Sequence, residues 1–224
     1  APWGLALGEV GILWGAWLAL GQRDLKRLGA YTSVSHMGFV LLGVYALDGV
    51  AWRGVLLQLI AHGLSTGGLF VVAGLVQART GTRQLADLGG LWPALPRLGG
   101  LTMVLVMASL GLPGLANFVA EFLVLLGTFR VQPLPAVLAA LGLVAATVYA
   151  LWLMQRTFHG EPRDGRRLFD LDARETAALA GCVVILVWLG LAPGPLLDLA
   201  GPPLEALRAA AVPSLSALTG GGAP

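Results

Sequence analysis

Residues 98–130, LGGLTMVLVMASLGLPGLANFVAEFLVLLGTFR, form an almost wholly apolar stretch that is interrupted by Gly111-Leu112-Pro113-Gly114. As one continuous helix it would reach roughly 50 Å, whereas the hydrocarbon core of a bilayer is about 30 Å thick. It is therefore too long for one straight span and too short for two full spans. Pro113 removes a backbone donor, and its flanking glycines permit non-helical dihedral angles. The sequence predicts a helix broken into two halves.

One acid, Glu121, follows this break by seven residues. A carboxylate at membrane depth beside a broken helix is an arrangement that transporters use to move ions. Loss of water favours its protonated form and hydration favours its charged form, so alternation between the two would load and release a proton. The alternative is a structural acid that is bonded to a neighbouring helix or to the broken backbone. Because acids inside spans are costly, we favour the functional role.

Composition places the whole chain in a membrane. The 224 residues are 57% hydrophobic and 12% charged, and apolar runs of about twenty residues recur, as in an all-α polytopic membrane protein. We expect a single transmembrane domain over residues 1–224, with a Pro- and Gly-rich surface tail at residues 199–224. Because the chain starts almost directly in an apolar segment, we expect a fragment of a longer protein. About six crossing units are predicted, at residues 3–20, 25–47, 54–77, 98–130, 136–158 and 176–197.

Positive charge decides how often residues 98–130 cross. With one crossing, all but three of the 14 basic residues share one side, and with two crossings they divide eight against six. The positive-inside rule favours the uneven division, with the Arg-rich loops cytoplasmic and both chain ends on the other side. The shared side would hold Arg23, Lys26, Arg27, Arg79, Arg83, Arg97, Arg156, Arg163, Arg166, Arg167 and Arg174, and the other side Arg53, Arg130 and Arg208.

Two histidines add to the candidate site. His36 in SVSHMG and His62 in IAHGLS each lie near the middle of a predicted span. An unperturbed pKa near 6.5 suits imidazole to proton relay. A lone histidine in an apolar helix is more often a packing residue, but two at similar depth with an acid nearby favour a relay. The residues expected to hold water or orient the rings are Ser33, Ser35, Ser65 and Thr66.

Other candidates for chemistry are weaker. Lys26, the only lysine, lies in GQRDLKRLG between two spans, where an interfacial anchor paired with Asp24 explains it as well as a transport role. Cys182 is the only cysteine, and no metal-ligand spacing is present. No phosphate-binding glycine loop or nucleophile triad appears. We therefore expect neither a metal nor a cofactor in this chain, and no nucleic-acid partner.

Three segments carry a family resemblance. DLKRLGAYTSVSHMGFVLLG, QLIAHGLSTGGLF and LGLPGLANFVAEFLVLLGTF resemble the antiporter-like membrane subunits of respiratory complex I, the proton-translocating NADH:quinone oxidoreductase. In that family the L- and N-type subunits carry lysine on the broken helix, where the M-type carries glutamate. Glu121 therefore points to the M-type, the counterpart of mitochondrial NADH dehydrogenase subunit 4. Relatives usually have glycine before this glutamate, and here Ala120, also small, stands in its place.

The resemblance implies a fourteen-helix fold with two inverted five-helix repeats, of which this chain matches the second repeat and the last helix. It implies that Glu121 is the ionisable group of the half-channel to the positive side. His36 and His62 then belong to the hydrated axis that delivers protons to it. The implied location is a bacterial inner membrane. The implied partners are the N-terminal half, L- and N-type neighbours, the lipid bilayer, and subunits that hold NADH, FMN, iron–sulfur clusters and quinone.

The expected function is proton translocation coupled to electron transfer from NADH to quinone, within a translocase whose redox chemistry lies in other subunits. The nearest alternative is a homologous subunit of a multi-subunit Na⁺/H⁺ antiporter or of a membrane-bound hydrogenase, because these share the motifs and the fold. The other alternative is a structural membrane module that only holds partner subunits together. It predicts that Glu121 and the histidines can be replaced without functional loss.

Overall fold

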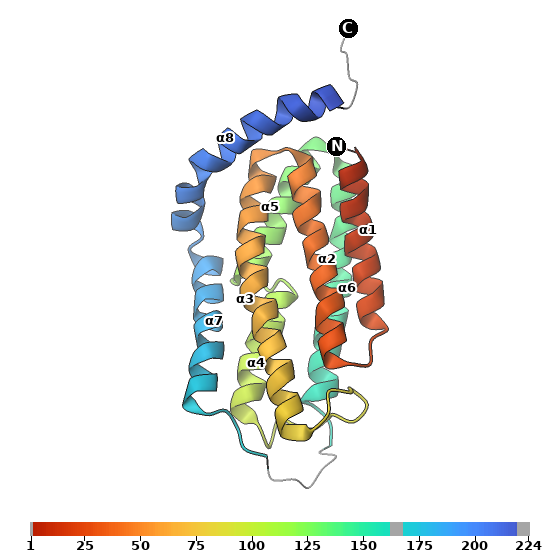
Figure 1. Cartoon of the computed structure of the whole chain (residues 1–224), viewed down its shortest axis with the longest axis vertical. Coiled ribbons are helices and arrows are strands. Elements are labelled where there is room, and N and C mark those ends of the chain that lie inside the picture. The colour runs from red at the N-terminus through yellow and green to blue at the C-terminus, as the bar shows by residue number, and fades with distance from the viewer. Residues whose placement is uncertain (1, 162–167, 219–224) are drawn as a thin grey trace.

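A computed structural model describes residues 2–161 and 168–218, and the regular elements in these ranges are helices. Five of them stand side by side, α4 and α5 share one column, and α8 lies across one end of the bundle (Figure 1). The helices are α1 (Pro2–Leu20), α2 (Leu25–Ala46), α3 (Gly49–Thr80), α4 (Pro96–Ser109), α5 (Ala116–Val131), α6 (Pro133–Thr157), α7 (Ala173–Leu191) and α8 (Gly194–Leu218).

The predicted break lies between α4 and α5. Gly111 and Gly114 have φ of 78° and 96°, in the left-handed region that favours glycine. The two helices have 14 and 16 residues, or roughly 21 and 24 Å, so each is too short to cross a bilayer core alone. α4 occupies one half of the bundle's height and α5 the other (Figure 1). Residues 98–130 therefore make one crossing from two half-helices, as the charge distribution predicted.

By length and composition, α1, α3, α6 and α7 can each cross a membrane. α2 has 22 residues and stands beside α1 and α3 over the same height, although its lysine, arginine, serines and histidine make it less apolar. With the α4–α5 column, the described residues thus form the predicted six crossing units. Apolar side chains cover the outer surface, as lipid tails or neighbouring helices require. Examples are Trp3, Leu7, Trp14 and Trp17 on α1 and Leu134, Leu141 and Val144 on α6.

The C-terminal region differs from the prediction. α7 ends at Leu191 rather than at residue 197, because Ala192 leaves helical geometry with φ −137° and ψ 66° just before Pro193. Residues 194–218 then form α8 despite the prolines within it. Helix thus occupies most of the predicted Pro- and Gly-rich surface tail, of which residues 219–224 lie outside the described ranges.

The loops 21–24, 81–95 and the described parts of 158–172 meet at the end of the bundle opposite α8, which we call the Arg-rich end (Figure 1). Arg53, Arg130 and Arg208 belong to the α8 end. Of the basic residues predicted to share one side, Arg163, Arg166 and Arg167 fall outside the described ranges. The others lie at or near the Arg-rich end: Arg23, Lys26, Arg27, Arg79, Arg83, Arg97, Arg156 and Arg174.

Asp24 joins two loops at this end. Its Oδ1 accepts hydrogen bonds from the backbone N–H groups of Lys26 and Arg27, at 2.9 and 3.0 Å, and so caps α2. Its Oδ2 accepts one from Arg83 Nε at 2.5 Å. Burial acts to raise the pKa of Asp24, but the hydrogen bonds from Arg27 and Arg83 outweigh it, so this pKa lies below its ordinary value.

Glycines bring helix backbones into direct contact around the bundle centre. A Cβ atom on Gly54 of α3 would lie 2.6 Å from Val124 N and 2.7 Å from Ala120 O of α5. Small residues allow such close approach between membrane helices. Ala120 and Val124 flank Glu121 along α5, so the Gly54 contact fixes how near α3 comes to this carboxylate.

We expect Gly54→Ala to destabilise the protein by about 1–3 kcal/mol, because the added methyl group meets the backbone of α5. Gly74→Ala, on the same helix, is the matched control, since nothing lies within 4 Å of its Cβ position. Thermal denaturation of the detergent-solubilised protein measures both. Equal melting temperatures for the two variants would contradict the close packing.

A second prediction concerns Asp24→Asn, which keeps a capping oxygen but removes the charge that faces Arg83. A carboxylate with a lowered pKa contributes stability that is present above its unfolded pKa and is lost as the pH falls through its folded pKa. We therefore expect a lower melting temperature than wild type at pH 7, with a difference that begins to shrink below about pH 4 and disappears below the folded pKa of Asp24. In an Arg83→Gln background, Asp24→Asn should lower the melting temperature little further. If the effects of the two substitutions on stability are fully additive, Asp24 and Arg83 do not interact.

Candidate functional site

Glu121 of α5 meets His36 of α2 and Gln58 of α3 inside the bundle. Glu121 Oε1 lies 2.9 Å from His36 Nδ1 and accepts a hydrogen bond from Gln58 Nε2 at 3.0 Å. The three residues are 1%, 1% and 0% exposed, respectively. Either Nδ1–H donates to the carboxylate or a protonated carboxyl donates to Nδ1. In both cases, one proton lies between the acid and the imidazole.

His62 of α3 stands next to this pair, with its ring centroid 5.4 Å from that of His36. Both of its ring nitrogens have hydroxyl partners. Ser33 Oγ lies 2.7 Å from Nε2, and Thr66 Oγ1 lies 3.1 Å from Nδ1. The structure thus brings the two histidines together, with Ser33 and Thr66 at the ring nitrogens of His62.

The other three predicted residues, Ser35, Ser65 and Lys26, have different surroundings. Ser35 Oγ donates to the carbonyl of Ile12 at 2.9 Å and so joins α2 to α1. Ser65 Oγ accepts a hydrogen bond from Asn117 Nδ2 at 3.2 Å, which ties α3 to the first turn of α5. Lys26 is exposed in the first turn of α2, at the Arg-rich end. It is not part of the buried cluster.

The helix break covers the other oxygen of the acid. A Cβ atom on Gly111 would lie 3.1 Å from Glu121 Oε2, and this oxygen is buried without a hydrogen-bond partner among the described residues. Pro113 and Gly114 complete the turn that brings the chain back into α5. The break therefore leaves one carboxylate oxygen bonded to side chains and the other free to accept a new donor.

Sequence reasoning missed three members of the site. Gln58 holds the carboxylate, while Tyr149 Oη and Ser109 Oγ lie 3.2 and 3.4 Å from His36 Nε2. Gln58 precedes His62 by four residues and so shares its helix face, which is a usable signal. Tyr149 lies with Thr147 in the otherwise apolar centre of α6, and only its contact with His36 reveals its place in the site.

A broken helix at the centre of an apolar bundle, with a buried acid held by an imidazole, defines a polytopic membrane protein with a titratable core. The chain belongs to the NADH:quinone oxidoreductase/Mrp antiporter transmembrane family, whose model matches residues 2–147.

Named relatives agree with this assignment. NADH-quinone oxidoreductase subunit M of Pseudomonas aeruginosa is 44% identical over 220 residues, which is 98% of this chain and 43% of that subunit. F(420)H(2) dehydrogenase subunit M of Methanosarcina mazei is 43% identical over 194 residues, 86% of this chain and 39% of that subunit. Both are subunits designated M, which confirms the M-type resemblance predicted from Glu121.

The fold also has a solved counterpart. A chain in respiratory complex I from Thermus thermophilus with bound NADH superposes with a TM-score of 0.85 at 38% identity, over 91% of this chain and 43% of that chain. The antiporter-like fold predicted from the sequence is thereby confirmed. The chain spans less than half the length of these relatives.

Two glycines with positive φ allow a test of the contact over Glu121. Gly111→Ala and Gly160→Ala, at φ 78° and 91°, should each cost about 1–2 kcal/mol of backbone strain. Nothing lies within 4 Å of the Gly160 Cβ position, whereas the methyl group at residue 111 meets Glu121 Oε2. We expect only Gly111→Ala to shift the infrared carboxyl band that Glu121→Gln abolishes. An unshifted band would place the break away from the carboxylate.

Proposed function

We propose that this chain is part of an antiporter-like subunit that conducts protons across the membrane within an NADH:quinone oxidoreductase. Glu121 is the group that carries the proton. The observation that supports this most directly is the 2.9 Å contact between Glu121 Oε1 and His36 Nδ1, which are nearly excluded from solvent. An acid and a base at this distance exchange a proton without moving charge through lipid. NADH, FMN, iron–sulfur clusters and quinone belong to other subunits of the complex.

The two imidazoles supply the approach to Glu121. Ser33, His62 and His36 form a row of hydrogen-bonding groups in which the rings are neighbours, and the far nitrogen of His36 meets Tyr149. A proton that reaches His36 Nε2 releases the Nδ1 proton to Glu121, so the ring returns to neutrality after each transfer. His62, whose ring centroid lies 5.4 Å from that of His36, extends this row toward α3.

A cavity of about 280 Å³ at the α8 end supports a release route from Glu121. Thr128 lines it, is fully buried, and has a hydroxyl without a partner among the described residues. Thr128 follows Glu121 by two turns of α5, roughly 10 Å, with fully buried Val124 between them. By the positive-inside rule we assign the Arg-rich end to the cytoplasm, which makes the α8 end the side of release.

Two other functions receive less support. The family also includes Mrp antiporter subunits, but the two M-type relatives are named as subunits of dehydrogenases, an NADH-quinone oxidoreductase and an F(420)H(2) dehydrogenase. A purely structural module has no use for a buried carboxyl bonded to an imidazole, since an apolar core of similar volume is at least as stable.

The test uses the full-length subunit in its intact complex. We expect Glu121→Gln to depress proton pumping and the NADH oxidation coupled to it, because an amide cannot carry the proton. Glu121→Asp should be milder because the titratable group survives. Glu205→Gln, which alters an exposed glutamate on α8, is the matched control. Acidification of proteoliposomes on NADH addition measures all three. Wild-type pumping by Glu121→Gln would refute the role.

A further inference from the structure

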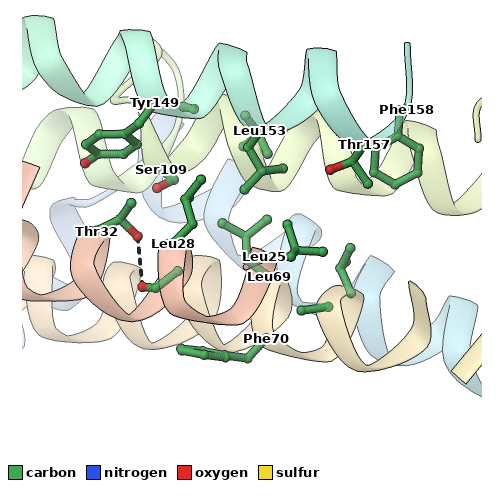
Figure 2. Close-up of a pocket in the computed structure, with 15 residues that line it drawn as sticks. Leu25, Leu28, Thr32, Leu69, Phe70, Ser109, Tyr149, Leu153, Thr157 and Phe158 are labelled. Atoms are coloured by element: carbon green, nitrogen blue, oxygen red, sulfur yellow. Dashed lines mark hydrogen bonds between the residues drawn. The ribbon is translucent and has the colours of Figure 1, made fainter. Parts of the chain in front are cut away.

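A second cavity leads from the histidine cluster toward the Arg-rich end, between α2, α3, α4 and α6 (Figure 2). Tyr149 and Ser109 lie at one end of it, Thr157 and Phe158 lie at the other, and leucines occupy the middle. Its free volume of about 20 Å³ has room for about one water molecule. The cavity begins at hydroxyl groups that contact His36 Nε2 and ends near the last turn of α6.

The helix register explains its elongated shape. Tyr149, Leu153 and Thr157 are spaced by four residues along one face of α6, so the two hydroxyl-bearing residues are roughly 12 Å apart. Leu25, Leu28 and Thr32 line the cavity from α2. Leu28 and Leu153 lie between the polar ends in Figure 2. The passage is therefore polar at both ends and apolar at its centre.

The hydroxyl group of Thr157 is the main evidence that water enters this cavity. It is 0% exposed, and its Oγ1 has no hydrogen-bond partner among the described residues. Three other helical threonines, Thr80, Thr102 and Thr147, donate to the carbonyl four residues earlier, whereas Thr128 shares with Thr157 a buried hydroxyl without a partner among the described residues. The Thr157 hydroxyl instead lines the cavity. A buried hydroxyl without a partner is costly, and a water molecule in the cavity would satisfy it.

We propose that this cavity is the closed form of a water passage that takes up protons at the Arg-rich end and delivers them to His36 directly. In this way the chain would be supplied without a detour through the rest of the subunit. About four waters at 2.8 Å spacing would connect Thr157 to Tyr149, far more than the present volume holds. The passage therefore conducts only after Leu28 and Leu153 move apart.

The proton balance along this passage is simple. Each water accepts one proton and gives up another, and Tyr149 passes its hydroxyl proton to His36 Nε2 as the water behind it restores that proton. His36 then gives its Nδ1 proton to Glu121. The net change is one proton taken from the Arg-rich side and one held by Glu121. This direction rests on the proposed function, whereas the existence of the passage does not.

Cysteine accessibility in the intact complex tests the passage. Leu153→Cys is introduced with Cys182→Ser, which removes the only native cysteine of this chain. A small, positively charged, membrane-impermeant methanethiosulfonate is applied to each membrane face separately. The thiolate attacks its sulfur, forms a mixed disulfide and releases methanesulfinate. Mass spectrometry of the fragment that contains residue 153 reports the labelling rate, at rest and during NADH oxidation.

We expect labelling only from the Arg-rich face, and at least about tenfold faster during turnover, because an open state populated at 10% or less limits the resting rate. Leu151→Cys, on the outer face of α6, should stay unlabelled, and exposed Gln155→Cys should be labelled in both states. Labelling of Leu153→Cys that is no faster than that of Leu151→Cys during turnover would overturn the proposal.

A second pair of variants tests the hydroxyl itself. Thr157→Val should slow pumping several-fold, and Thr157→Ser, which restores the hydroxyl, should recover it. Equal pumping by Thr157→Val and wild type would also overturn the passage. The outcome is separable from that for Glu121. If Glu121→Gln pumps normally while Leu153→Cys is labelled as expected, the proposed function fails and the passage stands.

Discussion

The contact between His36 Nδ1 and Glu121 Oε1 is the constraint on which the rest of the structure depends. A carboxylate deep in a membrane protein is costly unless a partner and hydrogen bonds compensate it. The fold meets this requirement from three helices at once, with the acid on α5, the imidazole on α2 and an amide donor, Gln58, on α3. Gly54 allows α3 to come close enough, and the helix break leaves room for the second carboxylate oxygen.

Both sides of this pair are closed by apolar side chains. Val124 separates it from the cavity at the α8 end, and Leu153 lies in the passage toward the Arg-rich end. A device that moves protons against a gradient must never connect both faces at once, since an open path would dissipate the gradient. The described conformation is closed on both sides. Under the proposed function, proton transfer toward either face then requires local displacement of one apolar layer.

Much of this architecture follows from the sequence because rare residues are informative in a membrane. The placement of the arginines indicated the number of crossings, and mid-span position or proximity to the helix break singled out His36, His62 and Glu121. Uncharged polar residues carry less information, so Gln58 and Tyr149 were found only through their contacts. Ser35 differs from its neighbour His36 because consecutive helical residues point about 100° apart, and its hydroxyl meets α1 instead. The prolines led to the prediction of a surface tail in place of α8, since composition does not reveal a helix that lies across the end of a bundle.

The glycine contacts between α1 and α2 have a mechanical consequence. Cβ atoms on Gly15 and Gly38 would lie 2.7 Å from Ser35 N and 2.6 Å from Ile12 N, so the two backbones interlock. If either helix slid by one residue, side chains would occupy the glycine positions and collide with the facing backbone. The two helices therefore form a rigid pair, and α2 holds His36 at a fixed position along the bundle axis. Under the proposed function, proton transfer at His36 would therefore rely on side-chain rotation rather than on sliding of α2 along α1.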